Sequence, residues 1–376
     1  ASRGLGDVYK RQVRQCHFGY FMQYGLRAKE RRPAGFEAPE IGTFLHYLLE
    51  NTAREVAGSG GWASVKTPQL HAMVRKYIDL YIRDEIPGYE EKSARFRYLF
   101  GRLRTTAEDI VDRMAEELAE SDFKPVAFEL GFGGRDGTLP AITIQEGDAT
   151  LSVSGKVDRV DGWLHDGKLY LRVVDYKTGR KSFDLSDVRY GLGIQMLLYL
   201  FTLEKEGQSC FGYPIVPAGV LYHPARDLIL KADRDITPEA LRRAMDRELR
   251  RDGMVLGDPE VLRAMEHSAL EAPCFLPIQV SKDGGISGGV ATAAQLGRLG
   301  QYVEKLLHQI IRELRQGNID ADPCWRGPQE SACTYCDFAS ACHFQDGQAG
   351  DRLRPLKRVK ADEFWEFVAH ETGEEG

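Results

Sequence analysis

Two short segments of this 376-residue sequence place carboxylates and a lysine where they could act on a phosphate ester. The segment VVDYKTG puts Asp175 and Lys177 two residues apart after an apolar run, and GKVDRVDGW puts Asp158 on the stretch before it. Side chains two residues apart on a strand leave the same face. A hairpin around HDGK would therefore bring Asp158 near Asp175, and such carboxylates suit Mg²⁺ or Mn²⁺, which activate water. The alternative is a surface Asp–Lys pair that closes a strand.

A second chemical signal is a cluster of cysteines near the C-terminus. Cys333, Cys336 and Cys342 account for three of the seven cysteines in the chain. Tetrahedral zinc sites and iron–sulfur clusters are usually held by four ligands. The spacing alone leaves the fourth ligand open between Cys324 and a distant residue.

The composition limits what surrounds these residues. Of all residues, 43% are hydrophobic and 28% are charged, as in globular proteins. No apolar run approaches the roughly 18 residues of a membrane span, so we expect no membrane contact. The lack of a secretory signal favours a reducing, cytoplasmic compartment, where clustered thiols bind metals more often than they form disulfides. The net charge of −6 implies that contacts with DNA come from local basic patches.

The periodicity of apolar residues predicts the elements that position these groups. The chain begins with expected helices, which are followed by a hairpin, a helix and a further strand. This order predicts an α/β fold with a mixed central sheet flanked by helices. The first dozen residues, 1–12, are interpreted as an artefact of library preparation fused to part of a longer protein, the alternative being a genuine N-terminus. We expect residues 13–122 to be mostly helical, 123–225 to form a catalytic core, and 226–320 to form an insertion and a long helix. Residues 321–346 hold the cysteine cluster, and 347–376 form a basic, then acidic tail.

Four motifs, taken in order, resemble the RecB-type branch of the PD-(D/E)xK nuclease superfamily. They are GxxxH at 42–46, GxxDRxD at 155–161, DYKTG at 175–179 and QxxxY at 195–199. The resemblance implies a restriction-endonuclease-like core that hydrolyses DNA with Mg²⁺ or Mn²⁺. It also implies a role for each motif residue: His46, Asp158 and Asp175 bind the metal, Lys177 is the catalytic lysine, Gln195 supports the site, and Tyr199 faces the DNA or packs beneath it.

The resemblance extends to the fourth cluster ligand. Cys16 lies in CHFGYFMQYGLR, which is similar to the segment that precedes the nuclease core in iron–sulfur members of the family. This implies that Cys16 joins the three clustered cysteines around a [4Fe–4S] cluster, a clip between the N- and C-terminal segments within 13–346. Zn²⁺ is the alternative metal.

The resemblance is closest to the C-terminal nuclease domains of AddB-type subunits of helicase–nucleases. It implies an exonuclease that acts in double-strand-break resection, with single-stranded DNA ends as substrate and an A-type helicase–nuclease subunit as partner. Arg97 and Arg102, next to aromatic residues, are expected contacts for a single strand. Two alternatives are a stand-alone nuclease of the CRISPR-adaptation type and a non-catalytic iron–sulfur scaffold that binds DNA.

Overall fold

The centre of the molecule is a mixed sheet, as predicted. The computed structural model describes residues 12–28, 38–133, 138–179, 182–226, 236–348 and 350–373. Most of the expected N-terminal artefact therefore lies outside the described residues. The sheet has six strands in the order β1-β4-β5-β6-β7-β10. Their bounds are Lys124–Phe132 (β1), Gly155–His165 (β4), Lys168–Lys177 (β5), Ile215–Pro224 (β6), Asp252–Leu256 (β7) and Val290–Ala291 (β10).

The middle of the sheet is the predicted hairpin of β4 and β5. Its turn residues Asp166 and Gly167 have φ values of 48° and 73°, the left-handed conformations that a two-residue hairpin turn requires. β1 extends the hairpin on one side as an antiparallel neighbour. On the other side β6 runs parallel to β5, because the chain returns through helix α7 (Gln195–Phe211).

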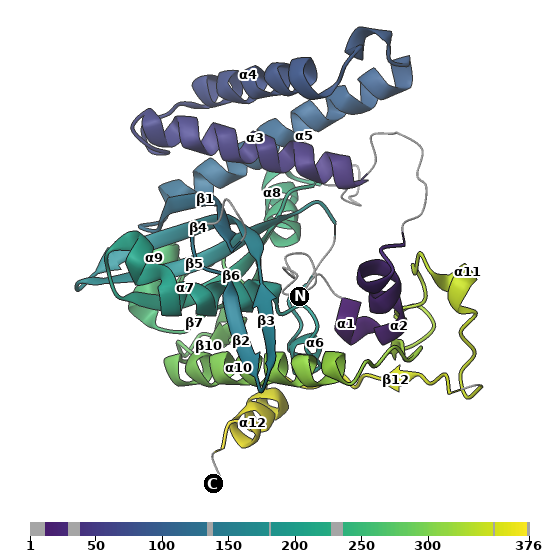
Figure 1. The fold of residues 1–376 in the computed structure, drawn as a ribbon. Coiled ribbons are helices and arrows are strands. Elements are labelled where there is room, and N and C mark those ends of the chain that lie inside the picture. Colours follow the sequence, from purple (N-terminus) through teal and green to yellow (C-terminus); the bar gives the residue numbers. More distant parts are fainter. Residues whose placement is uncertain are drawn as a thin grey trace.

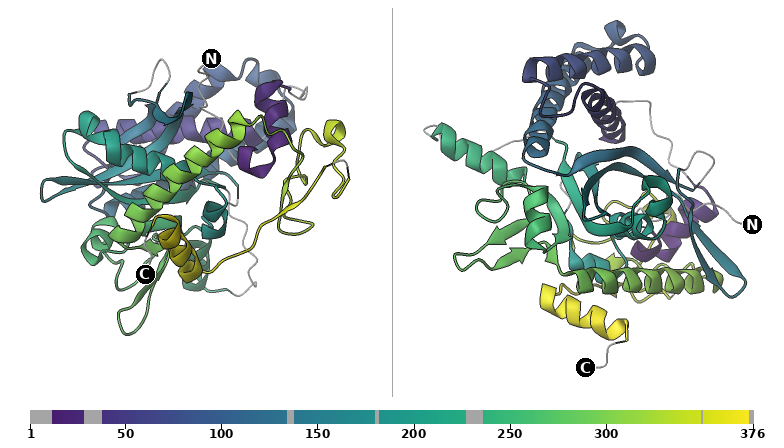
Figure 2. Two further views of the ribbon diagram at one scale, coloured as in Figure 1. Left: turned by 60° about the horizontal axis from the view of Figure 1, so that its bottom comes forward. Right: turned by 90° about the vertical axis from the view of Figure 1, so that its left-hand side faces the viewer.

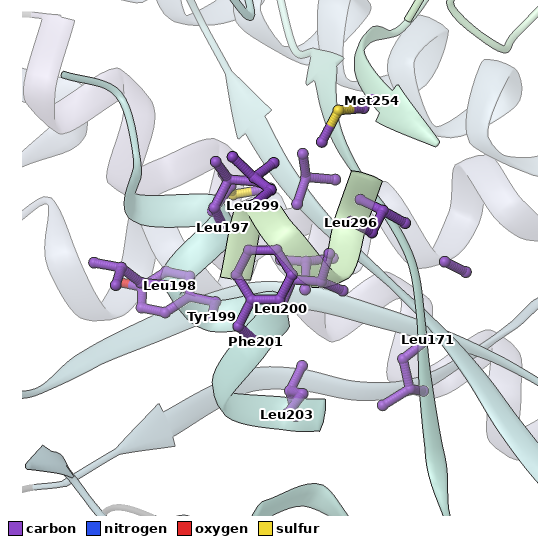
Figure 3. Packing of buried hydrophobic residues seen from close by; sticks show 14 of the residues in the cluster. Leu171, Leu197, Leu198, Tyr199, Leu200, Phe201, Leu203, Met254, Leu296 and Leu299 are labelled. Carbon is purple, nitrogen blue, oxygen red and sulfur yellow. The ribbon is translucent and has the colours of Figure 1, made fainter. Parts of the chain in front are cut away.

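Helices cover both faces of this sheet. One face carries α3 (Ala38–Gly58), α4 (Thr67–Glu85) and α5 (Ala94–Ala119), the upper layer in Figure 1. Their apolar residues form one core with Phe128 and Tyr176 of the sheet. The opposite face packs against α7 and α10 (Ala293–Arg315) in a second core, part of which Figure 3 shows around Leu197 and Leu299.

The remaining elements surround these layers. Two hairpins are formed by β2 (Ile142–Glu146) with β3 (Ala149–Val153) and by β8 (Ile278–Val280) with β9 (Ile286–Gly288). The short helices are α6 (Leu185–Arg189), α8 (Pro238–Glu248), α9 (Pro259–Met265), α12 (Ala361–Glu371) and the 3₁₀ turn Tyr89–Glu91. The segment predicted as an insertion, 226–320, supplies β7 and β10 and so completes the central sheet. Within the described ranges, no helix has the length and apolar character needed to cross a membrane.

The two ends of the described chain meet beside the sheet. The N-terminal helices lie next to a C-terminal segment. The N-terminal part consists of α1 (Gln12–Gln15), α2 (His17–Tyr20) and the π-helical turn Phe21–Gly25, and the C-terminal segment contains β11 (Cys324–Trp325), α11 (Ala339–Cys342) and β12 (Arg354–Pro355). Both Figure 1 and the left view of Figure 2 show these purple and yellow-green segments side by side. The amide of Phe18 donates to the carbonyl of Asp320 at 2.9 Å. The predicted proximity of the N- and C-terminal segments is therefore present in the fold.

Candidate active site and cysteine cavity

The two carboxylates predicted to converge lie on neighbouring strands at the end of the hairpin. Arg159 pairs with Val174, so the next step along the antiparallel strands brings Asp158 opposite Asp175. The row continues onto β6, because Tyr222 pairs with Asp175 in the parallel register. Paired residues in such a row project from the same face of the sheet. The register of three strands therefore gathers these side chains at the carboxyl end of β5.

His46 reaches this row from α3. Its Nε2 is 3.2 Å from the carbonyl oxygen of Tyr176, and its Nδ1 is 3.3 Å from Oδ1 of Asp158. A carbonyl oxygen only accepts, so Nε2 is a protonated nitrogen in this contact, and in the imidazolium form the N–H at Nδ1 donates toward Asp158. The other carboxylate oxygen of Asp158 accepts a 2.8 Å hydrogen bond from the amide of Tyr176. His46 and Asp158 are thus oriented by the same peptide unit.

Glu129 is a further carboxylate at this place, and it was not predicted from the sequence. The ligand atoms of His46, Glu129 and Asp158 all lie within 4.8 Å of one another. Glu129 has φ 50° within β1, a conformation that is uncommon for a residue with a side chain and that often marks functional sites. Its Oε2 is 2.6 Å from Nζ of Lys156. The only sequence signal was an acidic residue inside the apolar strand FELGF.

Asp175 and Lys177 form an ion pair on β5. Asp175 is 8% exposed, and the ammonium of Lys177 lies 5.7 Å from the centre of the Tyr222 ring. Burial opposes the protonated form of His46, but the hydrogen bond and charge of Asp158, helped by the charge of Asp175, outweigh it and raise the pKa of His46. The predicted residues Asp158, Asp175 and His46 are therefore neighbours, with Lys177 turned toward Asp175.

The four predicted cluster cysteines line one cavity. Cys16, Cys333, Cys336 and Cys342 all contribute to the wall of a space of about 290 Å³. Cys324, the alternative fourth ligand, lines a different pocket next to Trp325 and Arg326. Burial raises the pKa of the thiols of Cys16, Cys333 and Cys342. Thiols held in such a setting become thiolates readily only when a cation is bound to them.

A buried ionic clamp fixes the segment that carries Cys16. Nδ1 of His17 is 2.7 Å from Oδ2 of Asp322, and the backbone amide of His17 donates to Oδ1 at 3.0 Å. Arg354 lies 3.2 Å from the same carboxylate, and its guanidinium also donates to the carbonyl of Arg14 at 2.6 Å. The hydrogen bonds of His17 to Asp322 and Glu313 raise its pKa to about 9. The clamp holds the N-terminal segment in place next to the three clustered cysteines.

The family model that matches this chain is the PD-(D/E)XK nuclease superfamily, over residues 11–343. The chain belongs to this superfamily. Its fold class was predicted correctly from the sequence: an α/β nuclease fold with a mixed central sheet flanked by helices.

Curated relatives of this nuclease chain are similar over almost its whole length. They include proteins named as a subunit of an ATP-dependent helicase/deoxyribonuclease from Acetivibrio thermocellus, 34% identical over 363 residues, and from Clostridium tetani, 30% identical over 365 residues. Each alignment covers 96% of this chain but 32% of the relative. A protein of the same name from Thermoanaerobacter sp. is 32% identical with the same coverage. The nuclease chain therefore spans about a third of the length of these relatives.

The motif residues Gln195 and Tyr199 lie next to each other on α7 of the nuclease fold. Nε2 of Gln195 donates a 2.8 Å hydrogen bond to the hydroxyl of Tyr199. The Tyr199 ring stacks on Phe132 of β1 with centroids 5.3 Å apart, and Tyr199 is 4% exposed. Figure 3 shows it within the row of apolar side chains of α7. Of the two predicted roles for Tyr199, this placement favours packing beneath the site over contact with DNA.

Gly155, the first motif residue of β4, is required by this packing. A Cβ at Gly155 would lie 2.3 Å from the hydroxyl of Tyr199. We therefore expect Gly155→Ala to displace Tyr199, break its bond with Gln195, and destabilise the protein by about 1–3 kcal/mol, as overpacking does. Urea denaturation measures this change.

Gly42 provides the matched control, because it is also a motif glycine and nothing lies within 4 Å of its hypothetical Cβ. Gly42→Ala should stabilise α3 by about 0.5–1 kcal/mol, since alanine favours the helix. Equal midpoints for the two alanine variants would contradict the proposed contact between Gly155 and Tyr199.

Close to the row of Asp158, Asp175 and Tyr222, the nuclease buries a layer of charges against α5. The charged members of this layer are Glu117, Arg159, Asp161, Arg172 and Arg251. Arg159 and Arg172 each approach Asp161 at 2.9 Å, and Arg172 also reaches Glu117 at 3.1 Å. Arg159 donates to the hydroxyl of Tyr176 at 3.1 Å. The layer therefore anchors Tyr176, the residue whose backbone orients His46 and Asp158.

The charges of this layer decide which of its groups ionise. Burial would raise the pKa of Glu117, but Arg251, Arg172 and Arg159 outweigh it and hold the pKa far below its usual range. Burial lowers the pKa of His223 well below its ordinary value, so this histidine is neutral. Burial also raises the pKa of Tyr176 to about 12. The Tyr176 phenol is therefore a neutral partner for the Arg159 guanidinium.

The basic patch predicted to bind DNA is not part of the carboxylate site. Arg97 and Arg102 lie on α5 next to Phe100, which contacts Phe44 of α3 with ring centroids 5.0 Å apart. His46 is two residues further along α3, and residues two apart point to nearly opposite sides of a helix. α3 thus lies between the patch and the site. A DNA contact by Arg97 or Arg102 stays a prediction.

Proposed function

We propose that this chain hydrolyses DNA phosphodiesters in a reaction that depends on Mg²⁺ or Mn²⁺. The observation that carries the proposal is the convergence of His46, Glu129 and Asp158 next to the Asp175–Lys177 ion pair, in a chain of the PD-(D/E)XK superfamily. Carboxylates with one imidazole form a compact, partly charged donor set of the kind that divalent cations use. The convergence of these residues at one place favours a catalytic role over a non-catalytic scaffold.

The residues present fit a divalent cation. His46, Asp158 and Asp175, with Glu129 as a further donor, would hold the ion. When bound, it supplies Lewis acidity and promotes ionisation of a water molecule. The chain's own contribution is positional: Tyr176 orients His46 and Asp158, and Asp175 orients the ammonium of Lys177. That ammonium can donate hydrogen bonds to a phosphoryl oxygen as negative charge develops on it.

The cysteine cavity supports the second cofactor of this proposal, a [4Fe–4S] cluster held by Cys16, Cys333, Cys336 and Cys342. Four thiols line one cavity whose volume is about 290 Å³, and four thiolates are the usual ligand set of such a cluster. The cluster joins the two ends of the nuclease fold. Zn²⁺ is the alternative, and metal analysis of purified protein distinguishes the two.

The relatives support a wider role. Their names describe them as a subunit of an ATP-dependent helicase/deoxyribonuclease, so we propose that this chain is the nuclease part of a helicase–nuclease subunit. It would act as an exonuclease on single-stranded DNA ends during double-strand-break resection in the cytoplasm, with an A-type helicase–nuclease subunit as partner. The relatives' names favour this role over a stand-alone nuclease of the CRISPR-adaptation type.

The experiment that tests the proposal is digestion of end-labelled single-stranded DNA by anaerobically purified protein, with Mg²⁺ and with EDTA. We expect cleavage with Mg²⁺ alone, and the label reports the polarity of degradation. Folded protein that binds DNA but cuts nothing with Mg²⁺ or Mn²⁺ would contradict the proposal and favour the scaffold function.

A further inference from the structure

A basic cavity opens directly beside Lys177. It has a volume of about 330 Å³, and its wall includes Lys177, Tyr222 and three arginines from outside the sequence motifs: Arg226, Arg247 and Arg250. Two carboxylates, Glu248 and Asp252, also line it. Four cationic groups therefore face two anionic ones, in a chain whose overall net charge is −6.

The backbone explains why these residues meet at Lys177. The amide of Ala225 donates to the carbonyl of Lys177 at 2.8 Å, so Arg226 follows β6 immediately beside the lysine. Arg247 lies in the last turn of α8, and Arg250 stands between α8 and β7. β7 is the strand next to β6. The cavity thus extends the catalytic row sideways along the sheet.

The arginine charges in this cavity are poorly neutralised by the protein. Arg250 donates to the carbonyls of Pro273 at 2.7 Å and Ile278 at 3.4 Å, and its buried Nε has no hydrogen-bond partner. Within the described ranges, neither Arg250 nor Arg247 forms an ion pair with a carboxylate. Arg226 approaches the carboxylate of Glu248 only at 3.5 Å. Guanidinium groups left in this state favour an anion as ligand.

We infer that this cavity, named here the arginine pocket, binds the phosphate of the DNA strand next to the scissile phosphodiester. The inference rests on the proposed nuclease function, since it takes Lys177 as the residue that faces the scissile phosphate. Arg247 and Arg250 contact the adjacent phosphate, and Arg226 lines the same cavity next to the lysine. The pocket thereby fixes which phosphodiester of the strand reaches the carboxylates.

The test measures binding without cleavage. A fluorescent single-stranded oligonucleotide is titrated in EDTA at several salt concentrations with wild type, Arg247→Gln, and Arg247→Gln/Arg250→Gln. Each lost phosphate contact lowers the slope of log K against log salt by about 0.7 for single strands. Because Arg247 and Arg250 share one phosphate, we expect the slope to decrease by about 0.7 for the double variant and by a smaller amount for the single variant, with the affinity of the double variant reduced on the order of 10-fold or more.

Two controls make the result specific. Arg243→Gln removes the same charge from the exposed surface of α8 but does not line the pocket, so its slope should match that of the wild type. The single variant keeps the test valid if Arg250 is needed for folding, because Arg247 is exposed. An unchanged slope for Arg247→Gln, or an equal loss for Arg243→Gln, overturns the inference.

A neutral substrate locates the contact. Oligonucleotides with one methylphosphonate are bound by wild type and by the double variant. At one position next to the cut, the methylphosphonate should weaken binding by the wild type and leave binding by the double variant unchanged. The absence of any such position overturns the inference. Cleavage with Mg²⁺ is scored separately: an inactive wild type rejects the nuclease proposal, whereas the salt slopes still decide whether the arginine pocket binds a phosphate.

Discussion

Replacing Lys177 with methionine should lower the cleavage rate of single-stranded DNA by roughly 100- to 1,000-fold, while the fold stays intact. The magnitude is that of removing one preorganised donor from a developing oxyanion. Methionine keeps most of the apolar stem that packs near Tyr222, and it removes the ammonium that pairs with Asp175. The loss should therefore appear in the chemical step.

Single-turnover cleavage with excess protein isolates that step, because neither substrate binding nor product release limits the rate. The matched control is Lys168→Met, at the other end of β5. Lys168 pairs with His165 in the hairpin register and lies far along the strand from the carboxylates. Its replacement should leave the rate within about twofold. A Lys177→Met variant that cuts as fast as wild type would remove Lys177 from the catalytic role.

Asp175→Asn gives an independent measurement of the same site. The change keeps the shape of the side chain but removes the charge that orients Lys177 and contributes to the raised pKa of His46. Cleavage should fall by a similar or larger factor, while single-stranded DNA still binds. Loss of both cleavage and binding would indicate that Asp175 maintains the fold and has no specific role in the reaction.

The sequence sufficed for the parts of this site that depend on short-range geometry. Asp158 and Asp175 could be paired because a hairpin with a two-residue turn fixes its own register, and the alternation of strands places Asp175 and Lys177 on one face. The position of His46 followed from the order of motifs. Local patterns carry this information because the residues concerned lie on one hairpin or within one recognisable motif.

Other parts could not be predicted because they depend on contacts between distant segments. Glu129 reaches the site through an unusual backbone conformation in β1, which no alternation pattern indicates. Arg226, Arg247 and Arg250 come together only through the pairing of β6 with β7. Arg97 is separated from the carboxylates by α3, so its predicted contact with DNA lies away from this site and stays a prediction. Charge and composition in a window do not report which side of a helix faces a site.

Replacing Cys16 with alanine should remove the colour of the purified protein and destabilise the nuclease fold. Cys16 and Cys333 are separated by about three hundred residues, and closing a loop of that length contributes roughly 5–6 kcal/mol in the chain-entropy model of a single cross-link. Without the proposed cluster, the N-terminal segment would be held by contacts such as the ionic clamp of His17 with Asp322. Iron content and visible absorbance measure the loss of colour, and urea denaturation measures the destabilisation.

Two other cysteines make this prediction specific. Cys210 is exposed at the end of α7, so Cys210→Ala should keep both colour and stability. Cys324 is buried but lines a different pocket, so Cys324→Ala should retain the iron and lose only local packing. If Cys16→Ala kept its iron and its spectrum while Cys324→Ala lost them, the fourth ligand would be Cys324. Zinc in place of iron in the wild type would keep the clip between the chain ends but change its metal.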